Sequence, residues 1–237
     1  LEKVRKRRFP RTVIFSKRGD DMAIFNDDVK TQLRNALESM KKQVNVIFFT
    51  QKLECGICAD THEFLKEFTS LTDKLSLSAF DYIEERDKAA YYRIERVPCI
   101  ALLDDNDEDT RIRFYGIPAG YEINSFMRAI FEVSGVRSDI PPEILTRMKN
   151  ITRPVHIEVF VSLTCPYCPD AVSMAHRFAL ENTYVRADMI DASVFTPLAI
   201  RHNVNGVPKT IVNGKTALEG LSTLNSLVEA VENSRTT

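Results

Sequence analysis

The chain has 237 residues, of which 44% are hydrophobic and 27% are charged, and its formal net charge is −1. This length accommodates one large domain or two small ones, and the balanced charge argues against nucleic acid as a general partner. No apolar run is long enough to cross a membrane and no secretory leader is visible, so we expect a cytoplasmic protein without a membrane partner.

Cysteine is scarce, and its arrangement is informative. Four of the five cysteines form two Cys-x-x-Cys pairs. This number is too low for a disulfide-stapled secreted scaffold, and the pairing suits catalytic redox use in the cytosol. Tryptophan is absent and only three glutamines occur among abundant charges, a composition that leads us to expect a thermophilic source.

The first half of the chain alternates predicted strands and helices. Its first eighteen residues are basic and include Val13-Ile14-Phe15, which we interpret as an edge strand rather than as part of a nucleic-acid-binding arm. Apolar periodicity and turn residues predict the other elements. They are a helix over 27–42, a strand over 44–50, the pair Cys55-Gly56-Ile57-Cys58, a helix over 59–71, a strand over 75–82, a short helix over 87–93, hairpin strands over 97–103 and 111–115, and a helix over 123–134.

Pro141 and Pro142 mark a boundary, because proline is excluded from helix interiors and from central strands. We therefore predict a first unit over residues 1–140 and a second unit over residues 141–237. In the second unit a strand over 155–161 leads into Cys165-Pro166-Tyr167-Cys168, and a helix follows over 169–182.

The two units repeat one another. Cys55 and Pro98 are 43 residues apart, and so are Cys165 and Pro208. Each proline follows a valine, opens an apolar strand, and is followed by a turn, a second strand, a glycine and a last helix. A period of this kind indicates a duplicated fold.

Both cysteine pairs lie where a strand turns into a helix. The first cysteine of each pair then meets the free N–H groups and the positive end of a helix, which favour a thiolate. We therefore assign Cys55 and Cys165 as nucleophiles, and Cys58 and Cys168 as the residues that resolve the mixed disulfide. Zinc binding is the alternative, but Cys55 and Cys165 are 110 residues apart, unlike the pairs of a zinc ribbon. Cys99 is expected to be a buried core thiol.

The order of elements with these motifs resembles the thioredoxin fold twice over. This resemblance implies an α/β protein of two tandem thioredoxin-like units, each with a mixed central sheet flanked by helices. It also implies that the Val97-Pro98 and Val207-Pro208 bonds are cis and lie beside the cysteine pairs. Val97 and Val207 would then bind extended substrate segments through main-chain hydrogen bonds.

The chain as a whole resembles the thermophile protein disulfide oxidoreductases, which are glutaredoxin-like proteins related to protein disulfide isomerase. This resemblance implies reduction, oxidation or isomerisation of disulfides in protein substrates, without a metal or a bound organic cofactor. A thioredoxin-reductase-like flavoprotein would supply or remove the electrons.

The run around Cys165 to Val172, with Gly206-Val207-Pro208, is also similar to the N-terminal domain of bacterial alkyl hydroperoxide reductase flavoproteins. It implies an alternative function, an electron carrier between such a flavoprotein and a peroxidase of the peroxiredoxin type. A second alternative is a non-catalytic binding or chaperone module.

Glu158 is the candidate acid of the second site. It lies in an otherwise apolar strand, where a carboxylate is costly without a role or a partner. The resemblance implies that it moves the proton of Cys168, unless strand alternation turns it to solvent. Counted back from the first cysteine, its counterpart is Phe48. Because Glu54 also precedes Cys55, we expect the second pair to carry most of the reductase activity.

Overall fold

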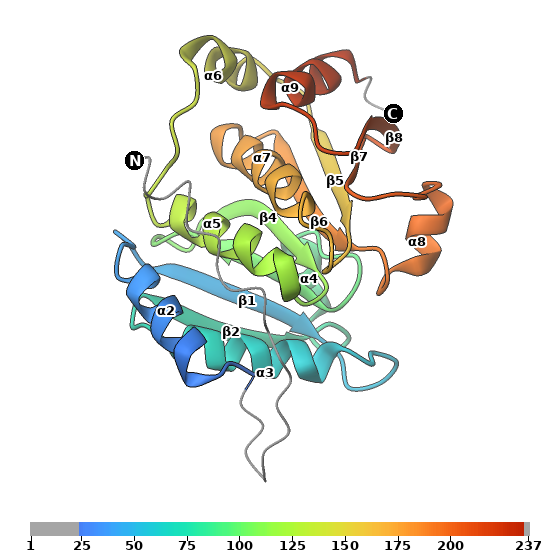
Figure 1. Ribbon diagram of the computed structural model, residues 1–237. Helices are drawn as coiled ribbons and strands as arrows, with labels where there is room; N and C mark the ends of the chain where they lie inside the picture. Colours follow the sequence, from blue (N-terminus) through green and yellow to red (C-terminus); the bar gives the residue numbers. More distant parts are fainter. Residues whose placement is uncertain (1–23, 235–237) are drawn as a thin grey trace.

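Two copies of one order of strands and helices share a single eight-stranded sheet in the computed structural model, which describes residues 24–234 (Figure 1). The predicted strand Val13-Ile14-Phe15 and the basic N-terminal stretch lie outside the described residues. The first copy comprises α2 (Asp27–Leu37), β1 (Val44–Thr50), α3 (Cys58–Thr69), β2 (Leu75–Asp81), α4 (Arg86–Tyr91), β3 (Cys99–Leu103), β4 (Asp109–Tyr115), the short 3₁₀ helix η1 (Gly120–Glu122) and α5 (Ile123–Val133). The second comprises α6 (Pro142–Lys149), β5 (Val155–Val161), α7 (Cys168–Glu181), β6 (Val185–Asp191), α8 (Thr196–Arg201), β7 (Lys209–Val212), β8 (Lys215–Glu219) and α9 (Leu224–Asn233).

The strand order is β2-β1-β3-β4-β6-β5-β7-β8. In the first copy β1 pairs parallel with β2 and antiparallel with β3, and β3 pairs antiparallel with β4. The second copy repeats this arrangement with β5, β6, β7 and β8. The parallel pair β4–β6 joins the copies, so the predicted tandem of mixed sheets is confirmed and the two sheets are continuous.

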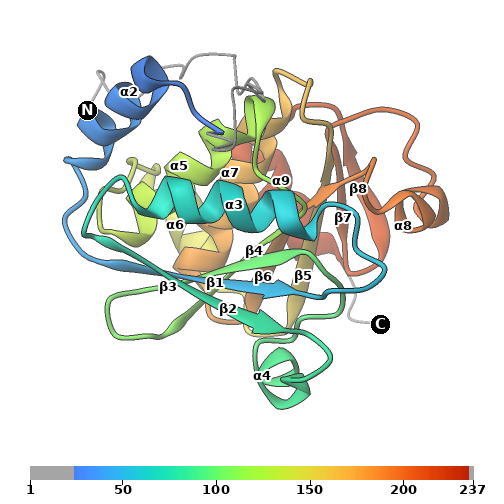
Figure 2. The ribbon, with the colours of Figure 1, turned by 90° about the horizontal axis from the view of Figure 1, so that it is seen from below.

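Helices cover both faces of the sheet. A large buried cluster lies under α3, α5 and α7 and includes Phe64, Phe126 and Phe178. A smaller cluster lies on the opposite face, under α4 and α8, and includes Phe49 and Phe160. Figure 2 shows α3 and α4 on opposite sides of β1 and β2. We call these the large-core face and the small-core face.

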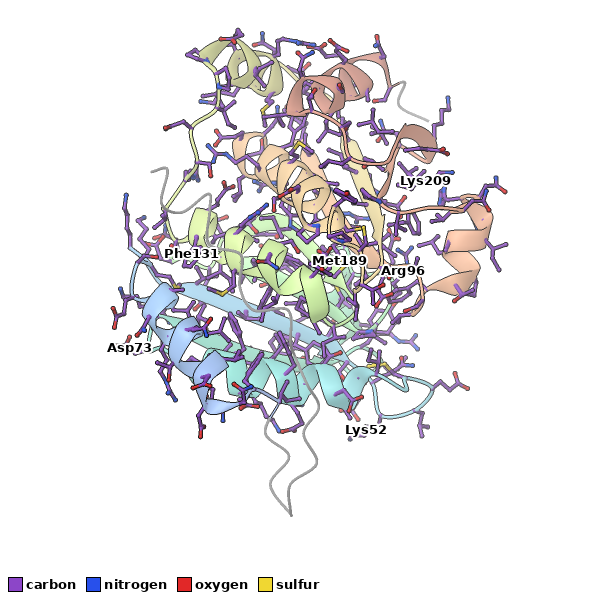
Figure 3. The ribbon with its side chains drawn as sticks, in the orientation of Figure 1. Lys52, Asp73, Arg96, Phe131, Met189 and Lys209 are labelled. Carbon is purple, nitrogen blue, oxygen red and sulfur yellow. A yellow bond between two sulfur atoms is a disulfide. The ribbon has the colours of Figure 1, made fainter. Side chains whose placement is uncertain are left out.

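The two copies also meet within the large core. Phe131 of α5 and Met189 of β6, both labelled in Figure 3, belong to this one buried cluster although they come from different copies. Packing of α5 against α7 therefore continues the contact that β4 and β6 make in the sheet.

One helix ends well before its predicted end, and another lies where none was predicted. The helix α2 begins after Asn26, whose Oδ1 accepts the N–H of Val29 at 2.9 Å, and it ends at Leu37 rather than at residue 42. The helix α6 lies where the two prolines predict none. Pro142 is its first residue, a position where the missing N–H costs nothing.

No helix among residues 24–234 has the length and the apolar character needed to cross a membrane.

Candidate active site

The first cysteine pair lies at the start of α3. Cys55 is in the turn that follows β1, and Cys58 is the first residue of the helix. The two are joined as a disulfide, with Cys55 half-buried and Cys58 buried. The outer position of Cys55 agrees with the order predicted for the two sulfurs.

The second pair lies at the start of α7, where Cys165 and Cys168 are free thiols. Cys168 is completely buried, whereas Cys165 is 9% exposed, so solvent reaches only the outer sulfur. The Sγ of Cys165 donates to the backbone carbonyl of Val207 at 3.7 Å. The outer thiol therefore lies against the peptide that precedes Pro208.

The Val97-Pro98 and Val207-Pro208 bonds are both cis, as predicted. Each proline lies immediately before a hairpin strand, β3 in the first copy and β7 in the second. In the second copy the contact between Cys165 and Val207 brings this turn to the cysteine pair. The binding of a substrate main chain at Val97 and Val207 stays a prediction.

The inner thiol of the second pair resists ionisation. Burial is the main cause that raises the pKa of Cys168 above that of a free thiol, and the neighbouring Cys165 and Glu122 raise this pKa further. Cys168 therefore needs a proton acceptor before it can attack a disulfide.

Glu122, at the end of η1 in the first copy, is the acid that can meet this need. Its side chain is completely buried, and its Oε2 accepts a hydrogen bond from the hydroxyl of Ser125. Burial raises the pKa of Glu122 to about 8, the hydrogen bond from Ser125 opposes this shift, and the nearby Asp191 adds to it. A carboxyl group with a pKa of this size can give and take a proton near neutral pH.

Gly120 and Tyr121 hold Glu122 in place. The backbone N–H of Tyr121 donates to the carbonyl of Leu163 at 2.9 Å, two residues before Cys165. Gly120 has a φ of +57°, and a Cβ at this position would lie 2.4 Å from the same carbonyl oxygen. The first copy thus approaches the second cysteine pair so closely that only glycine fits there.

Replacing Gly120 with Ala should destabilise the protein by more than the roughly 1–3 kcal/mol of a strained left-handed residue. The added methyl group would also meet the backbone of Leu163. Gly214→Ala is the matched control, because Gly214 has a φ of +74° with open space around its Cβ position. Urea unfolding measures both variants, and equal losses of stability would contradict this account of Gly120.

Glu158 does not lie at the cysteine pair, so its predicted position is wrong. In β5 the residues Ile157 and Val159 face the large core with Cys168, whereas Phe160 faces the small core. Because side chains alternate along a strand, Glu158 lies on the small-core face with Phe160. It is 6% exposed, and so it does not point to solvent either.

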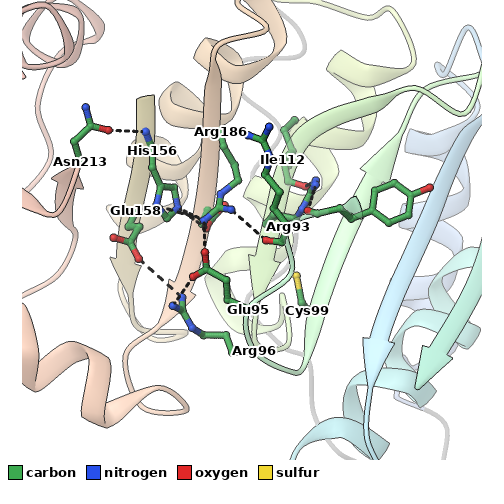
Figure 4. A network of polar contacts seen from close by, with 12 residues as sticks. Arg93, Glu95, Arg96, Cys99, Ile112, His156, Glu158, Arg186 and Asn213 are labelled. Carbon is green, nitrogen blue, oxygen red and sulfur yellow. Dashed lines mark hydrogen bonds and ion pairs between the residues drawn. The ribbon is translucent and has the colours of Figure 1, made fainter. Parts of the chain in front are cut away.

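A polar network surrounds Glu158 on that face (Figure 4). A carboxylate oxygen of Glu158 lies 3.9 Å from Arg96 of the first copy. In the same region His156 Nε2 and Asp188 Oδ2 are 2.6 Å apart, and Arg186 lies 3.3 Å from this Asp188 oxygen. The charge of Glu158 is therefore compensated by a contact between the copies.

Glu158 was misplaced because the turns before the two cysteine pairs differ in length. Seven residues separate β1 from α3, but six separate β5 from α7. Phe49 pairs with Cys99 directly after Pro98, and Phe160 pairs with Lys209 directly after Pro208. The structural counterpart of Glu158 is therefore Ile47 and not Phe48, and a shift of one residue reverses the face of a strand.

The remaining predicted groups lie apart from the two pairs. Cys99 is a completely buried free thiol, and burial raises its pKa to about 12. Within residues 24–234 no three His, Cys, Asp or Glu side chains come together in a group that could hold a metal ion.

Comparison with known proteins identifies the relatives of this fold. The thioredoxin domain family matches residues 155–232. The alkyl hydroperoxide reductase AhpF of Staphylococcus aureus strain MRSA252 is 31% identical over 205 residues, which cover 86% of this chain and 37% of that protein. The chain thus spans little more than a third of the length of this curated relative.

Two solved structures are similar over most of the chain. One is the NTD_N/C domain of alkylhydroperoxide reductase AhpF from Enterococcus faecalis, with 31% identity, a TM-score of 0.82, and coverage of 87% of this chain and 99% of that chain. The other is a protein disulfide oxidoreductase from Aeropyrum pernix K1, with 29% identity, a TM-score of 0.82, and coverage of 87% and 92%. The chain therefore belongs to the thioredoxin-fold proteins related to the N-terminal domain of the alkyl hydroperoxide reductase AhpF and to this archaeal protein disulfide oxidoreductase.

Proposed function

We propose that this chain is a thiol–disulfide oxidoreductase, in which the second pair exchanges electrons with a disulfide or dithiol of another protein. The single observation that carries this proposal is the arrangement of Cys165, Cys168 and Glu122. An outer thiol contacts the turn at Val207, an inner thiol is buried, and a buried carboxyl group lies near enough to raise the pKa of the inner thiol.

Reduction of a substrate disulfide takes two steps. The Cys165 thiolate attacks one substrate sulfur, the substrate disulfide bond breaks, and one substrate thiolate leaves. Cys168 then transfers its proton to Glu122 and attacks the Sγ of Cys165. The Cys165–Cys168 disulfide forms, the second substrate thiolate leaves, and two electrons have passed from the pair to the substrate.

Glu122 also serves the reverse half-reaction, which regenerates the dithiol. A thiolate of an electron donor attacks Cys165, and the leaving Cys168 thiolate takes the proton of Glu122. With a pKa of about 8, Glu122 is mostly protonated at neutral pH and can supply this proton. The reduction of the second pair is therefore the step that we expect Glu122 to assist most at neutral pH and below.

Two substrate classes have similar support. General protein substrates follow from the likeness to the Aeropyrum pernix protein, and a peroxiredoxin follows from the likeness to the alkyl hydroperoxide reductase AhpF. In either case a thioredoxin-reductase-like flavoprotein would supply the electrons. Isomerase activity, binding at Val97 and Val207, the unit boundary after residue 140, a cytoplasmic location and a thermophilic source belong to the same proposal.

A coupled assay tests the function and separates the two substrate classes. A thioredoxin-reductase-like flavoprotein with NADPH reduces this protein, and the acceptor is either insulin or a peroxiredoxin with hydrogen peroxide. A higher kcat/KM for insulin supports the general oxidoreductase, and a higher kcat/KM for the peroxiredoxin supports the electron carrier. No cysteine-dependent electron transfer to either acceptor would overturn the proposed function.

A further inference from the structure

Asp191 is a second buried acid at the junction of the two copies. It is the last residue of β6 and is only 1% exposed. Its Oδ1 accepts the backbone N–H of Ser193 at 2.9 Å and the Ser193 hydroxyl at 2.6 Å. Both hydrogen bonds use the same carboxylate oxygen.

The other carboxylate oxygen of Asp191 faces the first copy without a partner. Asp191 Oδ2 is buried and has no hydrogen-bond partner among the described residues, and the same is true of Glu122 Oε1. Gly116, which precedes η1, brings the two copies together here, since a Cβ on Gly116 would lie 2.8 Å from the Cβ of Asp191. Two acids from different copies therefore each leave one oxygen unpaired in the same buried region.

Two buried carboxyl groups in one region cannot both ionise at low cost, so one of them holds a proton. Asp191 accepts two hydrogen bonds from Ser193, whereas Glu122 accepts one from Ser125. We propose that Asp191 is a positioning residue for the proton of the second site: its negative charge keeps that proton on Glu122. This inference rests on the proposed function.

The other charged and titratable groups around Glu122 do not supply a net negative charge that would keep its proton in place. Arg128 of α5 and Asp170 of α7 form an ion pair, so their opposite effects on Glu122 offset each other. Cys165 and Cys168 are the reacting groups themselves. Asp191 is a buried carboxylate near Glu122 that forms no ion pair with a basic side chain of residues 24–234.

Removing the charge of Asp191 should shift the pH dependence with which the second pair is reduced. Asp191→Asn removes the charge and retains an oxygen that can accept from Ser193. Glu122 should then lose its proton at a lower pH, by on the order of one pH unit for two like charges in one buried region. Reduction of the second pair, which needs protonated Glu122, should therefore decline at a correspondingly lower pH than in the wild type.

The experiment follows reduction of the Cys165–Cys168 disulfide by dithiothreitol from pH 6 to pH 10, in full-length protein with Cys55→Ser and Cys58→Ser. Dividing each rate by the rate of this parent protein cancels the ionisation of dithiothreitol. For Asp191→Asn the ratio should fall several-fold between pH 7 and pH 8, and return toward one above pH 9. The double variant Arg128→Gln, Asp170→Asn is the control, because it removes both members of the exposed ion pair, and its ratio should stay near one.

Glu122→Gln separates the two proposals. The reduction rate of this variant, divided by that of the parent protein, should be well under one at pH values up to 8 and approach one above pH 9. If Glu122→Gln behaves so while Asp191→Asn gives a flat ratio, the inference on Asp191 is overturned and the proposed role of Glu122 stands. A flat ratio for Glu122→Gln would overturn that role itself.

A second variant tests the inference even if Asp191→Asn does not fold. Ser193→Ala removes one of the two hydrogen bonds that hold the carboxylate of Asp191. It should lower the pKa of Glu122, as Asp191→Asn does, but by a smaller amount. Carbon-13 NMR titration of the Glu122 carboxyl group reads this pKa directly, and an unchanged or raised pKa in both variants contradicts the inference.

Discussion

Cys165→Ser should lose at least about ten times more disulfide reductase activity than Cys55→Ser. Both variants lack one attacking sulfur, but the second pair also has Glu122, a buried acid of the first copy that acts on its inner cysteine. General acid–base groups contribute roughly 10²- to 10⁴-fold to a rate. The loss at the second pair should therefore dominate turnover, and insulin reduction with dithiothreitol as donor measures it.

The matched control for this comparison is Cys99→Ser. Cys99 is a buried thiol in β3 with a raised pKa, and it contributes to neither pair. Its replacement should leave turnover within about twofold of the wild type, apart from any loss of folded protein, which circular dichroism measures. Activity that falls more in Cys55→Ser than in Cys165→Ser would reverse the ranking of the two sites.

The duplicated architecture was predictable because its signals are local. Each cysteine pair, each Val-Pro dipeptide and each terminal glycine lies within one copy, and the 43-residue spacing relates the copies to one another. The positions of Cys55, Cys58, Cys165 and Cys168 at helix starts follow from this spacing and from apolar periodicity. The cis bonds at Pro98 and Pro208 followed from the family resemblance.

The acid of the second site was not predictable in this way, because it comes from the other copy. Glu122 lies 43 residues before Cys165 in sequence, and the pairing of β4 with β6 and the contact of Tyr121 with Leu163 bring its segment to the second pair. Such pairing of edge strands between units leaves no periodic signal. The sequence Gly116-Ile117-Pro118-Ala119-Gly120, with two glycines just before a glutamate, was the available hint of a close backbone approach.

Glu158 was misplaced for a complementary reason. Counting back from the cysteine assumes turns of equal length, and the turn before α3 is one residue longer than the turn before α7. In a strand this single residue decides between the face of the active site and the opposite face. Counting from the cis-prolines through the paired strands would have matched Glu158 with Ile47.

Glu122→Gln should make the protein more stable than the wild type at alkaline pH. The pKa of Glu122 is about 8 in the folded protein, above the ordinary value of 4.5 that applies when the chain is unfolded. The folded state therefore binds more protons than the unfolded state between these values, and the wild type loses stability as the pH rises through this range. Between pH 5 and pH 9 the loss attributable to Glu122 is on the order of 4 kcal/mol.

Urea unfolding of the reduced proteins at pH 5, 7 and 9 tests this expectation. Other groups also titrate over the range, so the informative quantity is the difference between the wild type and Glu122→Gln at each pH. That difference should move in favour of the variant by several kcal/mol from pH 5 to pH 9, because glutamine carries no charge into the buried site. Glu95→Gln, at an exposed carboxylate, serves as the control and should show no comparable trend. If the wild type and Glu122→Gln keep a constant difference in stability across these pH values, Glu122 does not ionise in the folded protein with a raised pKa, and its part in proton transfer to Cys168 is excluded.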